Sequence, residues 1–277
     1  MFVFTDEAGD NGLNSQDKYK IIIFSHFFDE NDIKDTVESF KKLSKFYFGN
    51  SLRSWKKQKG MIKNNPEILN KFLKDFLGET DNKFLLSVGI IEKNKEYYKN
   101  PSQVKDETIN LYANLFRRGI PFYKWAYYNL GGYKISGTPK IRWYIDQNDD
   151  QGFTKPLIKQ ISEYSKLNNV KLEGPKFLPK PKVLKKNKSD SIKILYSQTI
   201  EMTDNFSGII LKGLNNNDSK YDTTMKLIFS RAKYIKISIG EKKPWKWDNI
   251  MISPMDLKMK YIDLIGYDYY NVFDEYK

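Results

Sequence analysis

Three aspartates stand at positions where their carboxylates could act together. Asp6 and Asp146 each end an alternating, strand-like pattern, and Asp204 lies within a helical pattern. A charged group on an otherwise apolar strand costs free energy unless a partner such as a cation compensates it. If the fold gathers them, three such carboxylates can hold two divalent cations about 4 Å apart for phosphodiester hydrolysis. Each aspartate alone also fits an ordinary turn or a solvated helix face, so the inference rests on the three together.

The composition leaves carboxylates as the ligands that a metal site in this chain would use. The sequence contains no Cys and a single His, His26, which excludes disulfides, thiolate zinc sites, iron–sulfur clusters and a cysteine nucleophile. Carboxylates prefer hard cations, so the expected cofactor is Mg²⁺ or Mn²⁺, bound as two ions. His26 itself lies late in an apolar strand pattern, which is more typical of a core or edge residue than of a catalyst.

The charge balance favours a polyanionic partner. The chain has 47 Lys and Arg against 34 Asp and Glu, a formal net charge of +13, although an AT-rich genome would also raise the lysine content. No apolar run approaches the roughly 20 residues that span a bilayer, and the first residues lack the pattern of a signal peptide. We therefore expect a cytoplasmic protein that binds nucleic acid and no membrane, with its oligomeric state open.

Basic residues gather in three segments together with aromatic residues or prolines. Lysines neutralise phosphates without reading sequence, and exposed tryptophan rings stack on unpaired bases. Charge runs are also ordinary solvated surface, and Trp245 with Trp247 could instead be core residues on one strand face. The candidate nucleic-acid-binding residues are Arg53, Lys56, Lys57, Lys185, Lys186, Lys188, Lys243 and Trp245.

The elements that must position these residues predict a mixed α/β chain. The first two strands are close enough in sequence to pair antiparallel, and the second is apolar enough to be central. Residues 179–188, with two prolines and five lysines, predict a loop or mobile hairpin. Strands are expected at 2–6, 19–28, 83–92, 140–146 and 170–177, and helices at 31–47, 66–77, 102–118, 121–129, 154–168, 192–213, 222–235 and, as an amphipathic segment, 254–273.

Small residues surround Asp204 on its helical pattern. Thr203, Ser207 and Gly208 lie one, three and four residues from it. Small side chains at these spacings let a helix approach a sheet closely, which would carry the Asp204 carboxylate toward the strand ends.

A family resemblance covers the same three places. Residues 4–10, Phe-Thr-Asp-Glu-Ala-Gly-Asp, resemble the Tyr-Ile-Asp-Glu-Ser-Gly-Asp opening of the bacterial family named domain of unknown function 3800, whose members are considered ribonuclease-H-like. Residues 144–146, Tyr-Ile-Asp, are similar to a strand end in the middle of that family. Residues 201–208, Glu-Met-Thr-Asp-Asn-Phe-Ser-Gly, are similar to its late helix pattern Gln-x-Ala-Asp-x-x-Ala-Gly. The order and rough spacing of the three pieces agree.

The resemblance implies an α/β fold with a ribonuclease-H-like mixed sheet flanked by helices and with helical insertions. It implies a core over residues 1–213 and a C-terminal extension, 214–277, packed on that core. The implied activity is metal-dependent hydrolysis of RNA or DNA in a bacterial defence or mobile-element context. The implied catalytic residues are Asp6, Glu7, Asp146 and Asp204, and the implied metal ligands are Asp6, Asp146, Asp204 and Glu201.

The chain departs from the family pattern at four of the matched positions. Ala8 replaces Ser, Glu201 replaces Gln, and Thr203 and Ser207 replace the two alanines. Residues 51–56, Ser-Leu-Arg-Ser-Trp-Lys, resemble the Glu-Ile-Lys-Trp element of many relatives but lack its acid. The site is then one carboxylate short unless Glu7 or Glu201 substitutes. The alternative is a catalytically degenerate module of the same fold that binds nucleic acid or a protein.

Overall fold

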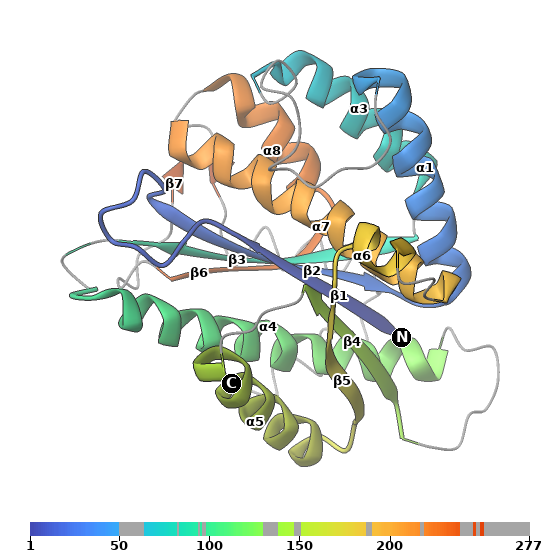
Figure 1. The fold of residues 1–277 in the computed structure, drawn as a ribbon, viewed down its shortest axis with the longest axis vertical. Helices are drawn as coiled ribbons and strands as arrows, with labels where there is room; N and C mark the ends of the chain where they lie inside the picture. Colours follow the sequence, from blue (N-terminus) through green and yellow to red (C-terminus); the bar gives the residue numbers. More distant parts are fainter. Residues whose placement is uncertain are drawn as a thin grey trace.

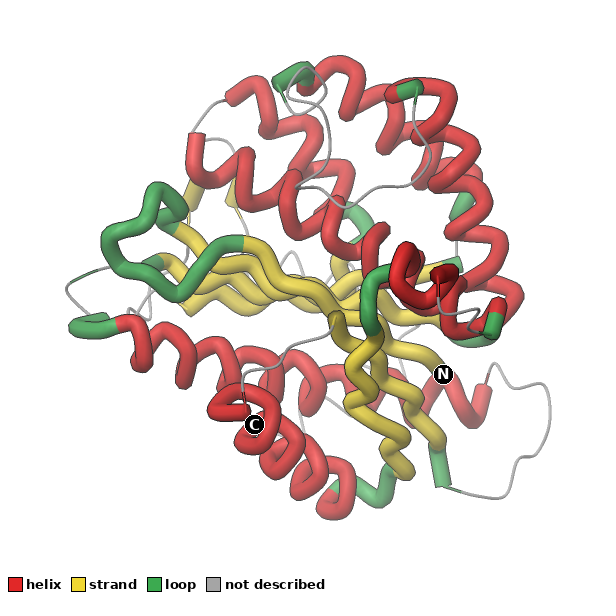
Figure 2. The backbone as a smooth tube through the Cα atoms, in the orientation of Figure 1, coloured by secondary structure: helices red, strands yellow, loops and turns green. Residues whose placement is uncertain are grey.

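The computed structural model describes residues 1–49, 64–81, 83–93, 95, 98–129, 138–146, 151–186, 190–216, 219–238, 246–247 and 250–251. Helices cover both faces of one mixed sheet (Figures 1 and 2). The strands are β1 Phe2–Ala8, β2 Tyr19–Phe27, β3 Phe84–Glu92, β4 Lys140–Asp146, β5 Lys171–Leu178 and β6 Ala232–Ser238, with a separate pair, β7 Lys246–Trp247 and β8 Ile250–Met251. The helices are α1 Glu30–Phe48, α3 Pro66–Glu79, α4 Pro101–Asn129, α5 Gln151–Leu167, α6 Pro181–Lys186, α7 Ser191–Asn216, the short η2 Ser219–Tyr221 and α8 Asp222–Phe229.

The main sheet has the strand order β5-β4-β1-β2-β3-β6. Strands β1, β2 and β3 form an antiparallel meander, because β1 pairs with β2 and β2 with β3 in opposite directions. Strands β4 and β5 follow on the other side of β1 and run parallel to it, and β6 runs parallel to β3. The carboxyl ends of β1, β4 and β5 therefore meet at one edge of the sheet.

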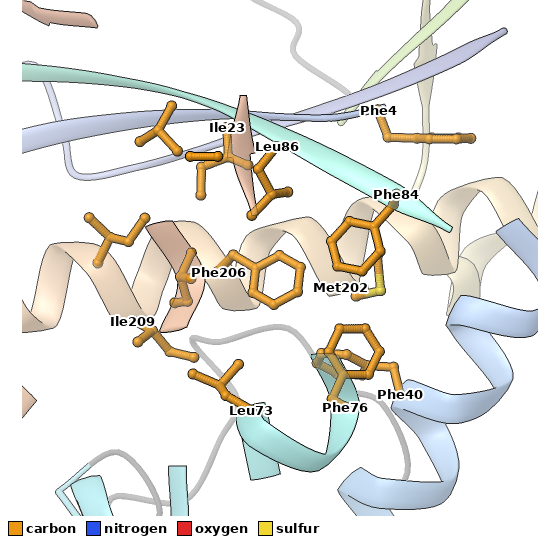
Figure 3. Close-up of a cluster of buried hydrophobic side chains, with 14 of the residues drawn as sticks. Phe4, Ile23, Phe40, Leu73, Phe76, Phe84, Leu86, Met202, Phe206 and Ile209 are labelled. Carbon is orange, nitrogen blue, oxygen red and sulfur yellow. The ribbon is translucent and has the colours of Figure 1, made fainter. Parts of the chain in front are cut away.

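One face of the sheet packs against α1, α3, α7 and α8 through a large aromatic core (Figures 1 and 3). Phe206 of α7 stacks on Phe84 of β3 with ring centroids 6.1 Å apart. Phe40 of α1 meets Phe76 of α3 edge to face at 5.2 Å. These rings bury a large apolar area, so they fix the height and direction of α7 over the sheet.

The opposite face packs against α4 and α5 around the buried indole of Trp143 (Figure 1). Phe116 of α4 stacks on Trp143 at 5.3 Å, and the Trp143 Nε1 donates to Thr5 Oγ1 at 3.0 Å. A β-carbon added at Gly89 would lie 2.7 Å from the Leu111 side chain, so the close approach of α4 to β3 needs glycine there.

The structure confirms the α/β class, the antiparallel pairing of β1 with β2 and the central place of β2. Four expected elements differ from the structure. Residues 179–188 contain the helix α6, which the apolar anchor Leu184 and the helix-starting Pro181 stabilise. The helices expected at 102–118 and 121–129 are the single helix α4. The helix expected at 222–235 ends at Phe229, and the strand β6 begins at Ala232.

The expected division after residue 213 falls inside α7, which continues to Asn216. Beyond it, α8 packs on α3, and β6 extends the main sheet beside β3. Residues as far as 238 therefore belong to the same layered unit, while the segment 254–273 lies outside the described residues. None of the described helices is long and apolar enough to cross a membrane.

Candidate active site

Asp6 lies near the end of β1, on the sheet face that α7 covers. It shares that face with Phe4, as the two-residue period of a strand requires. The residue is 5% exposed, and its Oδ2 atom finds no hydrogen-bond partner among the described residues. Three residues later the chain turns at Gly9, where φ is +85° and a β-carbon would lie 2.4 Å from the Tyr19 carbonyl oxygen. Only glycine fits this turn, so it ends β1 just beyond the carboxylate.

Asp146 is level with Asp6 on the neighbouring strand. Phe4 pairs with Tyr144 and Thr5 with Ile145 in the parallel ladder between β1 and β4. One further step in the same register brings Asp6 beside Asp146, on strands about 4.8 Å apart. The Asp146 side chain is 26% exposed, and its Oδ2 accepts a hydrogen bond from the Lys180 Nζ, with which it forms an ion pair.

Asp204 comes to the same edge from above, on α7. This helix packs on both β1 and β2, and a hydrogen bond of 2.9 Å joins the Thr203 hydroxyl to that of Ser25 on β2. Thr203 and Ser207 are fully buried, so the small side chains predicted to allow a close approach are those at the contact. Asp204 itself is 7% exposed. Asp204 and Asp146 both lie near enough to Asp6 for their charges to act on it, and a metal site shared by the three stays a prediction.

The charges of the three carboxylates act on one another. Burial raises the pKa of Asp6 well above its ordinary value, and the negative charges of Asp204 and Asp146 raise it further. The Lys180 charge and a hydrogen bond from the Glu7 backbone act in the opposite direction without cancelling the effect. The net effect of the described groups is therefore to disfavour the ionised form of Asp6.

Lys180 experiences the same three carboxylates from the other side. Burial alone would lower the pKa of its ammonium group. The hydrogen bond to Asp146 and the charges of Asp146, Asp6 and Asp204 outweigh burial and raise that pKa. Lys180 is thus a cation at neutral pH, and among the described residues it forms an ion pair with Asp146.

The donor set fits a hard divalent cation in chemistry, since it consists of carboxylate oxygens and includes the unpartnered, buried Asp6 Oδ2. It is not preassembled. Within the described part of the chain, no group of three or more His, Asp or Glu side chains is arranged to hold a metal ion. Binding of an ion would therefore require the carboxylate side chains to move, and the Lys180 ammonium group, which is paired with Asp146, to move as well.

The two glutamates of the predicted site lie differently. Glu7 is within β1, so it points to the opposite face from Asp6, where it forms an ion pair with Lys20 at 3.4 Å. Glu201 is one helical turn before Asp204 on α7 and half-buried. Glu201 thus lies on the same helix as Asp204, whereas Glu7 would reach the three aspartates only across the sheet.

Of the predicted nucleic-acid-binding residues, the structure describes Lys185 and Lys186. Both are exposed in the last turn of α6, and the charge of Lys185, together with burial, lowers the pKa of Lys41 on α1. Lys185 on α6 and Lys41 on α1 therefore lie close enough for their charges to interact. The other candidates, Arg53, Lys56, Lys57, Lys188, Lys243 and Trp245, lie outside the described residues.

Sequence reasoning missed Lys180 as a member of the site. It was one of five lysines in a segment predicted to be a loop. The structure explains its place, because Lys180 lies two residues after β5, and β5 runs parallel to β4 and ends at the same edge of the sheet. The sequence pattern alone did not pair β5 with β4. His26, by contrast, is a core residue as expected, with its Nε2 hydrogen-bonded to the Ser87 hydroxyl at 2.8 Å.

No protein-family model matches this sequence, and no curated protein is significantly similar to it. The resemblance to the domain of unknown function 3800 family therefore stays a prediction, and the argument for function rests on the site.

Proposed function

We propose that the protein is a divalent-metal-dependent nuclease that hydrolyses phosphodiester bonds in RNA or DNA. The observation that carries the proposal is the Asp6 carboxyl group. It is buried at the end of β1, one of its oxygens has no hydrogen-bond partner among the described residues, and Asp146 and Asp204 add negative charge beside it. A buried carboxylate in this setting is costly unless a cation joins it, and Mg²⁺ or Mn²⁺ suits its oxygens.

The topology supports a ribonuclease-H-like fold. In that fold, an antiparallel meander of three strands is continued beyond its first strand by two strands parallel to it. The order β3-β2-β1-β4-β5 has this arrangement here, and β6 would be an addition at the β3 edge. The three aspartates lie on the first strand, the fourth strand and the helix that crosses them, which is a placement such a nuclease can use.

In this proposal Asp6, Asp146 and Asp204 hold the ions, with Glu201 as the further carboxylate. Bound divalent ions would lower the pKa of a water molecule and neutralise charge on the phosphate. The chain's own contribution is position: the aromatic core behind β1 and α7 keeps Asp6 in place and excludes water from its inner side. The exposed Lys185 on α6, which begins beside Lys180, would bind the nucleic-acid backbone.

A cleavage assay tests the proposal. Purified protein with Mn²⁺ should cleave at least one of single-stranded RNA, single-stranded DNA or duplex DNA, and EDTA should stop it. Asp6→Asn and Asp204→Asn should each abolish cleavage because each removes a ligand charge. Asp106→Asn, on the exposed side of α4, is the matched control and should cleave like the unaltered protein. Full cleavage by both site variants would refute the proposal.

A second candidate function has its own observation. Lys180 already neutralises Asp146, and the described residues hold no preassembled ligand group, as expected of a degenerate module that binds nucleic acid or protein without cleaving. Such a module would bind nucleic acid with an affinity that falls steeply with salt and is indifferent to EDTA. A gel-shift titration between 50 and about 150 mM salt, with and without EDTA, distinguishes the two functions.

A further inference from the structure

Lys180 is held at the carboxylate edge by the backbone on both of its sides. Its carbonyl oxygen accepts from the Val183 N–H at 2.9 Å, which starts α6, and the Ser197 hydroxyl of α7 donates to the Pro179 carbonyl at 2.6 Å. The stem of Lys180 therefore begins at a fixed point between β5, α6 and α7. From there its ammonium reaches Asp146, while its side chain remains 39% exposed. A mobile surface lysine would have no such anchoring.

The Lys180 ammonium provides a hydrogen-bond donor to Asp146 but not to the buried Oδ2 atom of Asp6. It donates to Asp146 Oδ2, and the charges of Asp6 and Asp204 also help to raise the pKa of the ammonium group. The buried Oδ2 of Asp6 still has no hydrogen-bond partner within the described residues. The Lys180 ammonium therefore acts on three carboxylates, and among the described residues the Oδ2 atom of Asp6 keeps a position for another ligand.

We propose that Lys180 is the built-in counter-ion that a divalent metal ion must displace from Asp146, so that it sets the affinity of the site for metal. The proposal rests on the metal-dependent function proposed above. An ammonium ion and a divalent cation cannot share the same carboxylate oxygen without repulsion, and the exposed, flexible stem of Lys180 lets its head move into solvent. Removing the ammonium should therefore strengthen metal binding and weaken the metal-free protein.

The test measures metal binding itself rather than cleavage. Lys180→Met keeps the length of the side chain and removes its charge, and Lys180→Gln keeps a hydrogen-bond donor without the charge. Lys182→Met, exposed in the first turn of α6, is the matched control because it removes a nearby lysine other than the one in the ion pair with Asp146. Each protein is freed of metal, titrated with Mn²⁺ by calorimetry, and melted in EDTA and in Mn²⁺.

The expected result is a Kd for Mn²⁺ about tenfold lower in both Lys180 variants, a change of about 1.4 kcal/mol. The control should bind Mn²⁺ like the unaltered protein. In EDTA, Lys180→Met should melt at a lower temperature than the unaltered protein because Asp146 loses the Lys180 ammonium. Mn²⁺ should remove this difference in melting temperature. Lys180→Gln covers the case in which the Met variant does not fold.

The two proposals fail in different ways. If the unaltered protein and both Lys180 variants bind Mn²⁺ with the same Kd, Lys180 does not compete with metal, and the nuclease proposal stands alone. If binding weakens in the Lys180 variants, Lys180 assists metal binding and the inference is wrong. If no protein in the set binds Mn²⁺ at millimolar concentration, the metal-dependent function fails and the inference fails with it.

Discussion

Replacing Asp6 by Asn should stabilise the metal-free protein at neutral pH even though it removes the proposed activity. The native carboxyl group is buried beside Asp204 and Asp146, and these conditions raise its pKa. Its ionised form therefore lowers the free energy of unfolding at pH 7. Asn has nearly the same shape, carries no charge, and brings an N–H₂ group that can donate to a neighbouring carboxylate.

The magnitude follows from the unsatisfied buried group. Leaving a buried acceptor without a partner costs about 1–3 kcal/mol, and more where the group is charged. Relief of that cost by Asp6→Asn should raise the melting temperature by about 2–4 °C for each kcal/mol in a chain of roughly this size. The lost attraction between Asp6 and Lys180 acts in the opposite sense. The expected gain in the free energy of unfolding is therefore in the lower half of the range of about 1–3 kcal/mol.

The sign of the pH dependence is fixed by the raised pKa. A carboxyl group whose pKa is higher in the folded state binds its proton more tightly there, so its contribution favours folding at low pH. Below the ordinary pKa of 3.8, both states hold the proton and Asp6 carries no penalty. The penalty grows as the pH rises above 3.8 and is complete once the pH exceeds the folded pKa. The gain from Asp6→Asn should therefore be small near pH 4 and largest at pH 7–8.

Urea denaturation in EDTA across pH 4–8 checks this, with Asp106→Asn as a control that should stay within about 0.5 kcal/mol of the unaltered protein. Adding Mn²⁺ at a hundred times its Kd should then stabilise the unaltered protein by about 2.7 kcal/mol and leave Asp6→Asn unchanged. An Asp6→Asn variant that is less stable than the unaltered protein at pH 8 in EDTA, or a difference independent of pH, would refute the reasoning.

Two further predictions concern the supports of the site. Thr203→Val should lower the free energy of unfolding by about 1–3 kcal/mol because it leaves the buried Ser25 hydroxyl without its hydrogen-bond partner on α7. In a double-mutant cycle measured by urea denaturation, adding Ser25→Ala should recover most of this loss. Fully additive effects of the two substitutions would contradict the prediction. Lys93→Met should cost about 1–3 kcal/mol and speed hydrogen exchange over residues 9–18. The buried Lys93 ammonium donates there to Asp10 Oδ1, Gly12 O and Ser15 Oγ, and unchanged exchange would show that the loop does not depend on it.

Much of the sheet was predictable because its strands carry strong patterns. β2 reads Ile-Ile-Ile-Phe over residues 21–24, buried on both faces, and a central strand is the place where such a run fits. The parallel partners β4 and β5, by contrast, could not be assigned to β1 from pattern alone. Their pairing depends on long crossover connections through α4 and α5, which local sequence does not specify.

The site was predictable where a charge interrupted an apolar pattern. Asp6 and Asp146 stood out because each follows apolar strand residues, and Asp204 because small residues surround it. Lys180 had no such signal, since one lysine among five carries no information about which carboxylate it meets. Glu7 shows that adjacency in sequence does not place two side chains in one site. It follows Asp6 directly, but β1 extends to Ala8, so the Glu7 side chain points to the opposite face of the sheet.

The choice between a metal site and a structural ion pair depends on Asp6 rather than on Asp146. Lys180 explains Asp146, because the pair is satisfied and partly exposed, as many structural ion pairs are. It does not explain a second carboxylate, 5% exposed, with one oxygen unpartnered among the described residues and two like charges beside it. For stability alone, an apolar residue at position 6 would fit better, since it would continue the face of Phe4 into the core. A structural ion pair therefore leaves the buried Asp6 carboxyl group at the meeting point of β1, β4 and α7 unexplained, and a bound cation is the partner that we propose for it.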